Sequence, residues 1–272
     1  MRSGSDRALG IERRADGADS RESTLLSDRG LSEVVGYVLI FALIISVVGI
    51  ITVTGFAQFE DTQEVEQHKN AERGFDVLAT NLVEVYEGGA PSRATELNIG
   101  EAQLQTGEDM TVNVTVYHAD GDDRIVHDVT PLELTGIDET DFVYEGGAVF
   151  RDASEGGLVL QDPPFVVSED RVMLPIVHTY TERDQAISGT TVLVRTLSTE
   201  RSVEVAAQGE SVDEIVLRIE NSPRQELWLR YFENEDLGDA CGETGDAIQC
   251  EIDAPDGRVF VTTQTIELRL EQ

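Results

Sequence analysis

Few residues of this chain have the types and spacing that chemistry requires. No GxSxG, HExxH, CxxC or glycine-rich phosphate loop occurs. The chain has four histidines, His68, His118, His127 and His178. They lack the spacing of metal ligands, so we expect each to be a structural or surface residue. We therefore expect no enzyme, no cofactor and no bound metal in this chain.

One acidic stretch, Asp120-Gly121-Asp122-Asp123, offers carboxylate oxygens of the kind that bind Ca²⁺. The other ligands of a known calcium loop are missing from it. In a chain with so many carboxylates, a hairpin turn is the simpler interpretation of these residues.

The only two cysteines, Cys241 and Cys250, have eight residues between them. This spacing suits a small hairpin-like loop, with Gly242 and Gly245 making the turn. A disulfide there would stabilise the fold by about 2.5 kcal/mol in the loop-entropy description. Two free thiols are the alternative.

Asn113-Val114-Thr115 is an N-glycosylation sequon. Strand alternation places Asn113 on the polar face beside Thr115, where a transferase could reach it. Sequons also arise by chance, so the motif alone leaves glycosylation open.

The elements that would position these residues are mostly strands. Residues 110–118 alternate apolar and polar side chains with a period of two, which is typical of a half-buried strand. Similar short runs cover residues 141–143, 157–160, 165–167, 171–177, 190–197, 202–206, 214–220 and 259–270. Turn residues separate them, and this spacing predicts an antiparallel β-sandwich.

One helix interrupts the strands. We expect Ser222 as its N-cap and Pro223 at its first position, with Leu227, Trp228, Tyr231 and Phe232 on one side. Trp228 is the only tryptophan and is expected in the core.

The charge of the chain is strongly acidic. Its formal net charge is −33, with 53 acidic residues and a single lysine, Lys69. Nucleic acid is therefore excluded as a natural partner. Such a surface suits molar salt, where the Debye length is about 3 Å and carboxylates repel one another little. Acidity with almost no lysine points to a haloarchaeal source.

Residues 34–59 contain no charge, between Glu33 and Glu60. As a helix this run would be about 39 Å long, against about 30 Å of bilayer hydrocarbon. We expect a single membrane span. Arg29 just before it favours a cytoplasmic N-terminus and an extracellular remainder, where an oxidising environment suits the cysteines. A buried soluble helix and a cleavable secretory signal are the alternatives.

The helix should continue beyond the membrane. Residues 60–86 contain no proline, and one face carries an apolar stripe: His68, Ala71, Phe75, Leu78, Leu82 and Val85. The sequence at residues 87–92 should stop it. This predicts an amphipathic stalk, residues 60–88, on which a head domain packs.

The junction Arg29-Gly30 before Leu31, directly ahead of the apolar run, resembles the class III signal peptide of archaeal type IV pilins and archaellins. The resemblance implies that a prepilin peptidase cuts after Gly30 and leaves the apolar helix on the mature protein. Arg29 and Gly30 would end the leader, and Leu31 would be the new N-terminus. Pilin subunits of the same or a related type would then be partners.

Taken together, the sequence predicts an α+β protein in four parts: a cleaved leader (residues 1–30), a transmembrane helix (31–59), the stalk (60–88) and an extracellular β-sandwich head with one short helix (90–272). The expected function is a pilin-like filament subunit. The alternative is a single-pass membrane protein whose extracellular head binds a ligand or partner and never polymerises.

Overall fold

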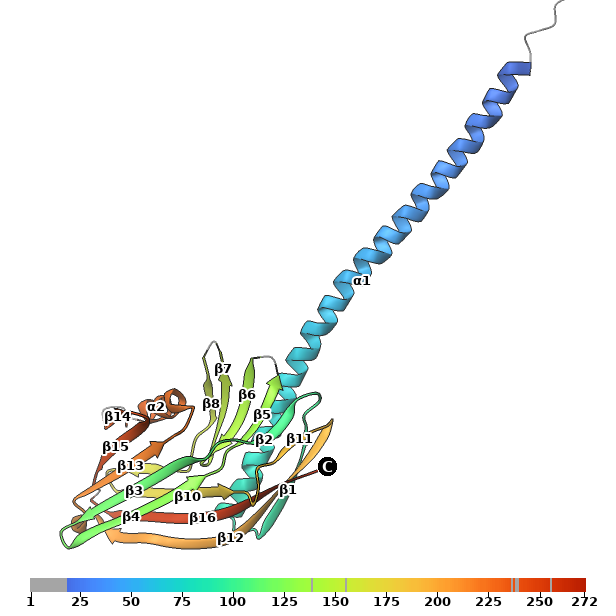
Figure 1. The fold of residues 1–272 in the computed structure, drawn as a ribbon. Coiled ribbons are helices and arrows are strands. Elements are labelled where there is room, and N and C mark those ends of the chain that lie inside the picture. The colour runs from blue at the N-terminus through green and yellow to red at the C-terminus, as the bar shows by residue number, and fades with distance from the viewer. Residues whose placement is uncertain (1–18, 138, 155, 236, 238–239, 255) are drawn as a thin grey trace, which may run out of the picture. The chain divides into compact units, whose positions relative to one another are not determined.

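The computed structural model describes residues 19–137, 139–154, 156–235, 237, 240–254 and 256–272, with side chains of α1 described at residues 34–52 and 66–86. The fold is α+β, with one N-terminal helix, a short second helix and mostly antiparallel sheets (Figure 1). The chain divides into two compact units, Met1–Asp61 and Thr62–Gln272.

The first helix, α1, spans Asp19–Tyr86 and contributes to both units. In the second unit its apolar stripe is buried as the spacing predicts, at Ala71, Phe75, Leu78, Leu82 and Val85, while His68 is half-buried. The helix ends at Tyr86, where the Glu87-Gly88 turn follows.

Three sheets make up most of the second unit. Sheet A has the order β1 (Ser92–Asn98), β12 (Thr191–Gln208), β16 (Arg258–Glu271), β10 (Arg171–Tyr180) and β9 (Val166–Ser168). Sheet B has the order β11 (Ala186–Ser188), β2 (Gln103–Thr106), β5 (Leu132–Ile137), β6 (Thr140–Glu145), β7 (Ala148–Ala153) and β8 (Leu158–Gln161). Sheet C has the order β14 (Cys241–Thr244), β15 (Ala247–Asp253), β13 (Glu214–Glu220), β3 (Met110–His118) and β4 (Gly121–Val129).

Two of the predicted strands are confirmed residue for residue, β3 and β13. The two runs expected at 190–197 and 202–206 form one strand, β12, whose register shifts near residues 199 and 204. One pair of neighbours departs from the antiparallel expectation, because β10 and β16 run parallel. Parallel neighbours need a long crossover connection, which here is the chain between them, including β12 and sheet C strands.

Sheet B buries both of its faces, so the second unit has two hydrophobic cores. Val143 and Phe150 point into core 1, which also contains sheet C side chains and helix α2 (Gln225–Asn234). Phe142 and Tyr144, one residue on either side of Val143, point into core 2, which contains the buried stripe of α1. Alternation along a strand accounts for this division.

Sheet A contributes opposite faces to the two cores at its two ends. In β10, Val172, Leu174 and Ile176 pack in core 1, whereas Val177 packs in core 2. In β16 the same change separates residues 259 and 261 in core 1 from residues 266 and 268 in core 2. The unburied face therefore also changes sides along the sheet.

The expected N-cap of the second helix is wrong. The cap residue of α2 is Arg224, and Pro223 lies in the turn before it. Ser222 Oγ accepts a hydrogen bond from the Arg224 backbone N–H at 3.1 Å and donates one to Glu145 at 2.6 Å. Because it serves these two partners, Ser222 shapes the turn instead of capping the helix.

Candidate functional site

The predicted processing junction lies inside α1. Arg29, Gly30 and Leu31 are helical, and the helix has no break between Asp19 and Tyr86. The side chains of these three residues lie outside the described set, as do residues 1–18 of the expected leader.

The apolar part of α1, Val34–Thr52, has a mean hydropathy of 2.9 and is long enough to cross a membrane, although a signal sequence has the same properties. Its large apolar side chains are 47–71% exposed, on every side of the helix. The hydroxyls of Ser46 and Thr52 donate to the carbonyls of Ala42 and Val48, each at 2.8 Å. These bonds satisfy the hydroxyls without water, as hydrocarbon surroundings require.

The end of α1 is fixed to sheet A by one guanidinium. Arg201 Nη2 donates to the carbonyl oxygens of Val85 and Tyr86, each at 3.0 Å, and its Nε donates to Gln264 at 2.7 Å. The last turn of α1 has no basic residue of its own, so this arginine from β12 supplies both the hydrogen bonds and the positive charge that a helix C-terminus favours. Sequence spacing gives no indication of it, because Arg201 lies in a distant strand.

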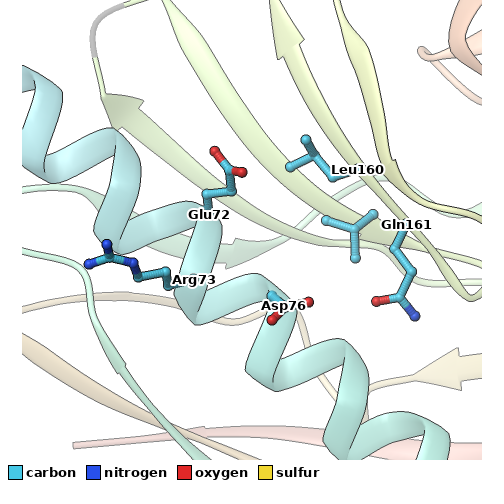
Figure 2. Close-up of a pocket in the computed structure, with 6 residues that line it drawn as sticks. Glu72, Arg73, Asp76, Leu160 and Gln161 are labelled. Atoms are coloured by element: carbon cyan, nitrogen blue, oxygen red, sulfur yellow. The ribbon is translucent and has the colours of Figure 1, made fainter.

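A hollow of about 180 Å³ lies beside α1 where the helix passes β7 and β8 (Figure 2). Glu72, Arg73 and Asp76 line it from the helix, and Leu160 and Gln161 line it from β8. Its walls thus combine charged groups, an amide and methyl groups. These groups can bind a ligand by ion pairing and apolar contact, but they include no hydroxyl, thiol or imidazole nucleophile.

A buried carboxylate connects sheet B to α2. Glu145 is 0% exposed and accepts hydrogen bonds from Ser222 Oγ, from Arg224 Nε at 2.7 Å and from Trp228 Nε1 at 2.7 Å. Arg224 also donates to Glu133 at 2.9 Å. Burial alone would lower the pKa of Arg224, but the two carboxylates outweigh burial and raise it. Trp228 is buried as expected, at 0% exposure.

Every donor around Glu145 is therefore satisfied, which is the arrangement of a structural network. Among 53 acidic residues the sequence does not distinguish this one. The one available signal is Trp228, whose indole N–H needs an acceptor when it is buried.

Two histidines without metal-ligand spacing in the sequence lie together in the fold. The rings of His127 and His178 are 4.8 Å apart, centroid to centroid. His127 Nε2 contacts Thr263 Oγ1 at 3.1 Å, and His178 Nδ1 contacts Thr265 Oγ1 at 3.3 Å. Burial lowers the pKa of both imidazoles, and His127 lowers that of His178 further.

No group of three or more metal-ligating side chains occurs within the described part of the chain. The acidic stretch at Asp120–Asp123 contributes to the hairpin between β3 and β4, in which His118 pairs with Gly121. The hairpin interpretation of this stretch is confirmed.

Asn113 is only 6% exposed, so the expectation of an accessible amide is wrong. Its side chain does lie on the polar face, but β3 is an inner strand, and Asn113 stands between Arg218 of β13 and Val126 of β4. These neighbours cover it, and its Oδ1 has no hydrogen-bond partner among the described residues. Glycosylation of this asparagine itself stays a prediction.

Cys241 and Cys250 form a disulfide between directly paired residues of β14 and β15. Gly245, at φ +71°, is in the turn of this hairpin, as expected. Gly242 is not in the turn but in β14, opposite Gln249. The bond attaches the edge strand of sheet C to core 1, where Cys250 is fully buried.

The comparisons with known proteins give one family. Residues 29–269 match a family of unknown function, DUF7289, and the chain therefore belongs to this family. No curated protein matches the chain. No solved structure matches it either.

Proposed function

We propose that this protein is a pilin-like structural subunit of an archaeal type IV pilus or a related cell-surface filament. In this proposal a prepilin peptidase removes residues 1–30, and the chain crosses the cell membrane once before assembly. The head is an acidic, sandwich-like domain outside the cell, in a haloarchaeal environment of molar salt. The role is structural and needs no cofactor.

One observation carries the proposal. Arg29-Gly30 stands immediately before an uncharged helical segment whose described side chains are exposed all round. A helix that is apolar on every side needs lipid or other helices around it. In a filament, the same segments of neighbouring subunits would replace lipid contacts with helix contacts.

The second unit supports the same interpretation. The part of α1 after Thr62 is amphipathic and buries Phe75, Leu78 and Leu82 in core 2. The Arg201 cap further ties the helix end to the head. The head thus packs on one face of the α1 segment that follows the apolar run in the chain.

The family match gives independent support for the junction. It begins at Arg29, two residues before the proposed new N-terminus at Leu31, and leaves residues 1–28 outside. A leader that is discarded need not share sequence within a family, whereas the retained helix and head must keep theirs.

The test is the N-terminus of the protein purified from native membranes. A start at Leu31 supports the proposal. Gly30→Phe should block cleavage, because a bulky side chain obstructs the approach that glycine, without a Cβ, permits. The variant should keep the leader and stay out of filaments. Gly17→Phe, the same change within the leader, is the matched control and should be processed normally.

A second candidate is a single-pass membrane protein whose extracellular head binds a ligand or partner. The unbroken course of α1 through Arg29–Leu31 favours it, since an anchor that keeps its leader would have this form. The hollow beside Glu72 and Asp76 would offer it a binding site. Two results would favour this candidate over the filament subunit. The native N-terminus would lie near Met1, and the Gly30→Phe protein would differ in mass from the wild type only by the substitution itself.

A further inference from the structure

One face of sheet A continues beyond the end of α1. Strand register places three rows of side chains on it, because directly paired residues project to the same side. The first row is Ser168, Arg171, Arg258 and Gln208; the second is Val166, Met173, Phe260 and Ala206; the third is Pro175, Thr262 and Val203. The residues between these rows, such as Val172 and Val259, point the other way into core 1.

The second and third rows form what we call the apolar strip: Val166, Met173, Phe260, Ala206, Pro175, Thr262 and Val203. Val203 is 64% exposed, which is more than any other large apolar side chain described in the second unit. Val166 is 37% exposed, and Phe260 and Met173 are half-buried. Contiguous apolar surface of this kind marks an interaction site.

The charge of this face contrasts with the rest of the protein. None of the three rows contains a carboxylate, although the chain has 53 acidic residues. Two exposed arginines, Arg171 and Arg258, border the strip in the first row. Arg201 lies beyond the third row, opposite Gln264. The face is thus apolar in the middle and basic at both ends.

The strip ends in a hollow of about 200 Å³ next to the end of α1. Tyr86, Arg201 and Val203 are among the residues that line it, together with Pro175 and Thr262 of the third row. A hollow at the edge of an apolar surface can receive an anchoring side chain of a partner, which is where binding energy concentrates in interfaces.

We propose that the apolar strip is a docking surface for the acidic head of a second copy of this chain. Charge complementarity selects this occupant, because a copy with a net charge of −33 supplies carboxylates for Arg171 and Arg258. An anionic lipid surface would satisfy the same arginines, and the crosslinking experiment below distinguishes it from a second copy. Copies anchored in one membrane also face each other at high effective concentration, which favours a modest interface.

This inference does not depend on cleavage after Gly30 or on filament formation. It requires only that copies share a membrane, so it applies equally to an anchored protein that keeps its leader. Its test therefore uses the full chain in the Gly30→Phe background as well as in the otherwise unchanged protein. If cleavage fails and docking persists, only the proposed function is overturned.

The experiment places a photoreactive group on the strip. Val203→Cys is labelled with a maleimide photo-crosslinker in native membranes, while Cys241 and Cys250 are protected by their disulfide. Illumination should give a covalent dimer whose second partner, identified by peptide mass spectrometry, is the same chain. Val126→Cys is the matched control, since Val126 is a 46% exposed strand valine on another sheet, and it should give little dimer.

Three results would overturn the proposal: adducts of Val203→Cys with lipid alone, monomer alone, or dimer yields equal to those of Val126→Cys. An added variant addresses the energetics. Val203→Glu should lower the yield of dimer obtained with a dihydrazide crosslinker that joins activated carboxylates, of which the chain has 53, because the variant brings a carboxylate to the surface that receives carboxylates. Val126→Glu should leave that yield unchanged.

Discussion

Replacement of Glu145 by leucine should destabilise the second unit severely. The change keeps a similar apolar volume but removes the acceptor of three hydrogen bonds, from Ser222, Arg224 and Trp228. Arg224, only 7% exposed, would retain Glu133 as its one described carboxylate partner. The indole N–H of Trp228 would be buried without its acceptor.

The size of the effect follows from these losses. Removal of one partner from a buried ion pair costs about 3–5 kcal/mol. An unsatisfied buried N–H adds about 1–3 kcal/mol. The two losses share one site and overlap, and the remaining Glu133 contact reduces the first, so we expect about 4 kcal/mol in all. That is a large part of the roughly 5–15 kcal/mol that keeps a typical domain folded.

Urea unfolding of the full chain in detergent and molar KCl, followed by the fluorescence of the single tryptophan, measures this loss. Glu271→Leu is the matched control, because Glu271 and its partner Arg195 are both about 40% exposed at the surface and the midpoint should scarcely move. The double variant Glu145→Leu/Arg224→Met should recover part of the loss, since it removes both charges. A single variant that loses less than about 1 kcal/mol, or a double variant that recovers nothing, would refute the reasoning.

Three further predictions concern the second unit. Tyr144→Phe should leave stability unchanged or raise it by about 1 kcal/mol, because the Tyr144 hydroxyl is buried without a partner among the described residues; a loss of stability on urea unfolding would reveal a partner. A fragment of residues 62–272 should fold cooperatively in molar KCl and lose its thermal transition in dilute buffer. A fragment of residues 90–272 should fold in neither condition, because it lacks the α1 side chains of core 2. Equal melting of the two fragments would contradict this. Since burial holds the pKa of His127 and His178 below the unfolded value of 6.5, the unfolded chain binds more protons, and stability should fall as pH drops below about 6.5. In His127→Gln/His178→Gln the loss between about pH 7 and pH 5 should be smaller, and an identical loss would show that other groups cause it.

The sequence predicts well those helices and strands whose spacing of apolar residues, or whose length, is enough to define them. β13 alternates buried and more accessible residues along its whole length, and β3 does so over most of its length, except at the buried Asn113, so the bounds of both strands follow from the pattern. The stripe of α1 follows from helical spacing in the same way. The sequence does not predict β4, because its first four residues are all exposed and three of them are charged, which is typical of a turn.

The features of the candidate sites that the sequence does not predict depend on residues far apart in the chain. The contact between His127 and His178 joins two sheets, and the hydrogen bonds of Glu145 join a strand to a helix. The error at Asn113 has a related cause. Alternation correctly assigns its face, but its burial depends on β3 being an inner strand, paired with β13 on one side and with β4 on the other.

Sheet A links the unfolding of the two cores. β10 and β16 each contribute side chains to core 1 at one end and to core 2 at the other. Neither core can therefore melt by itself while these two strands stay paired. Loss of packing in one core would free strands that the other core requires as its wall. The second unit should therefore melt in a single two-state transition, and calorimetric and van't Hoff enthalpies measured on it should agree.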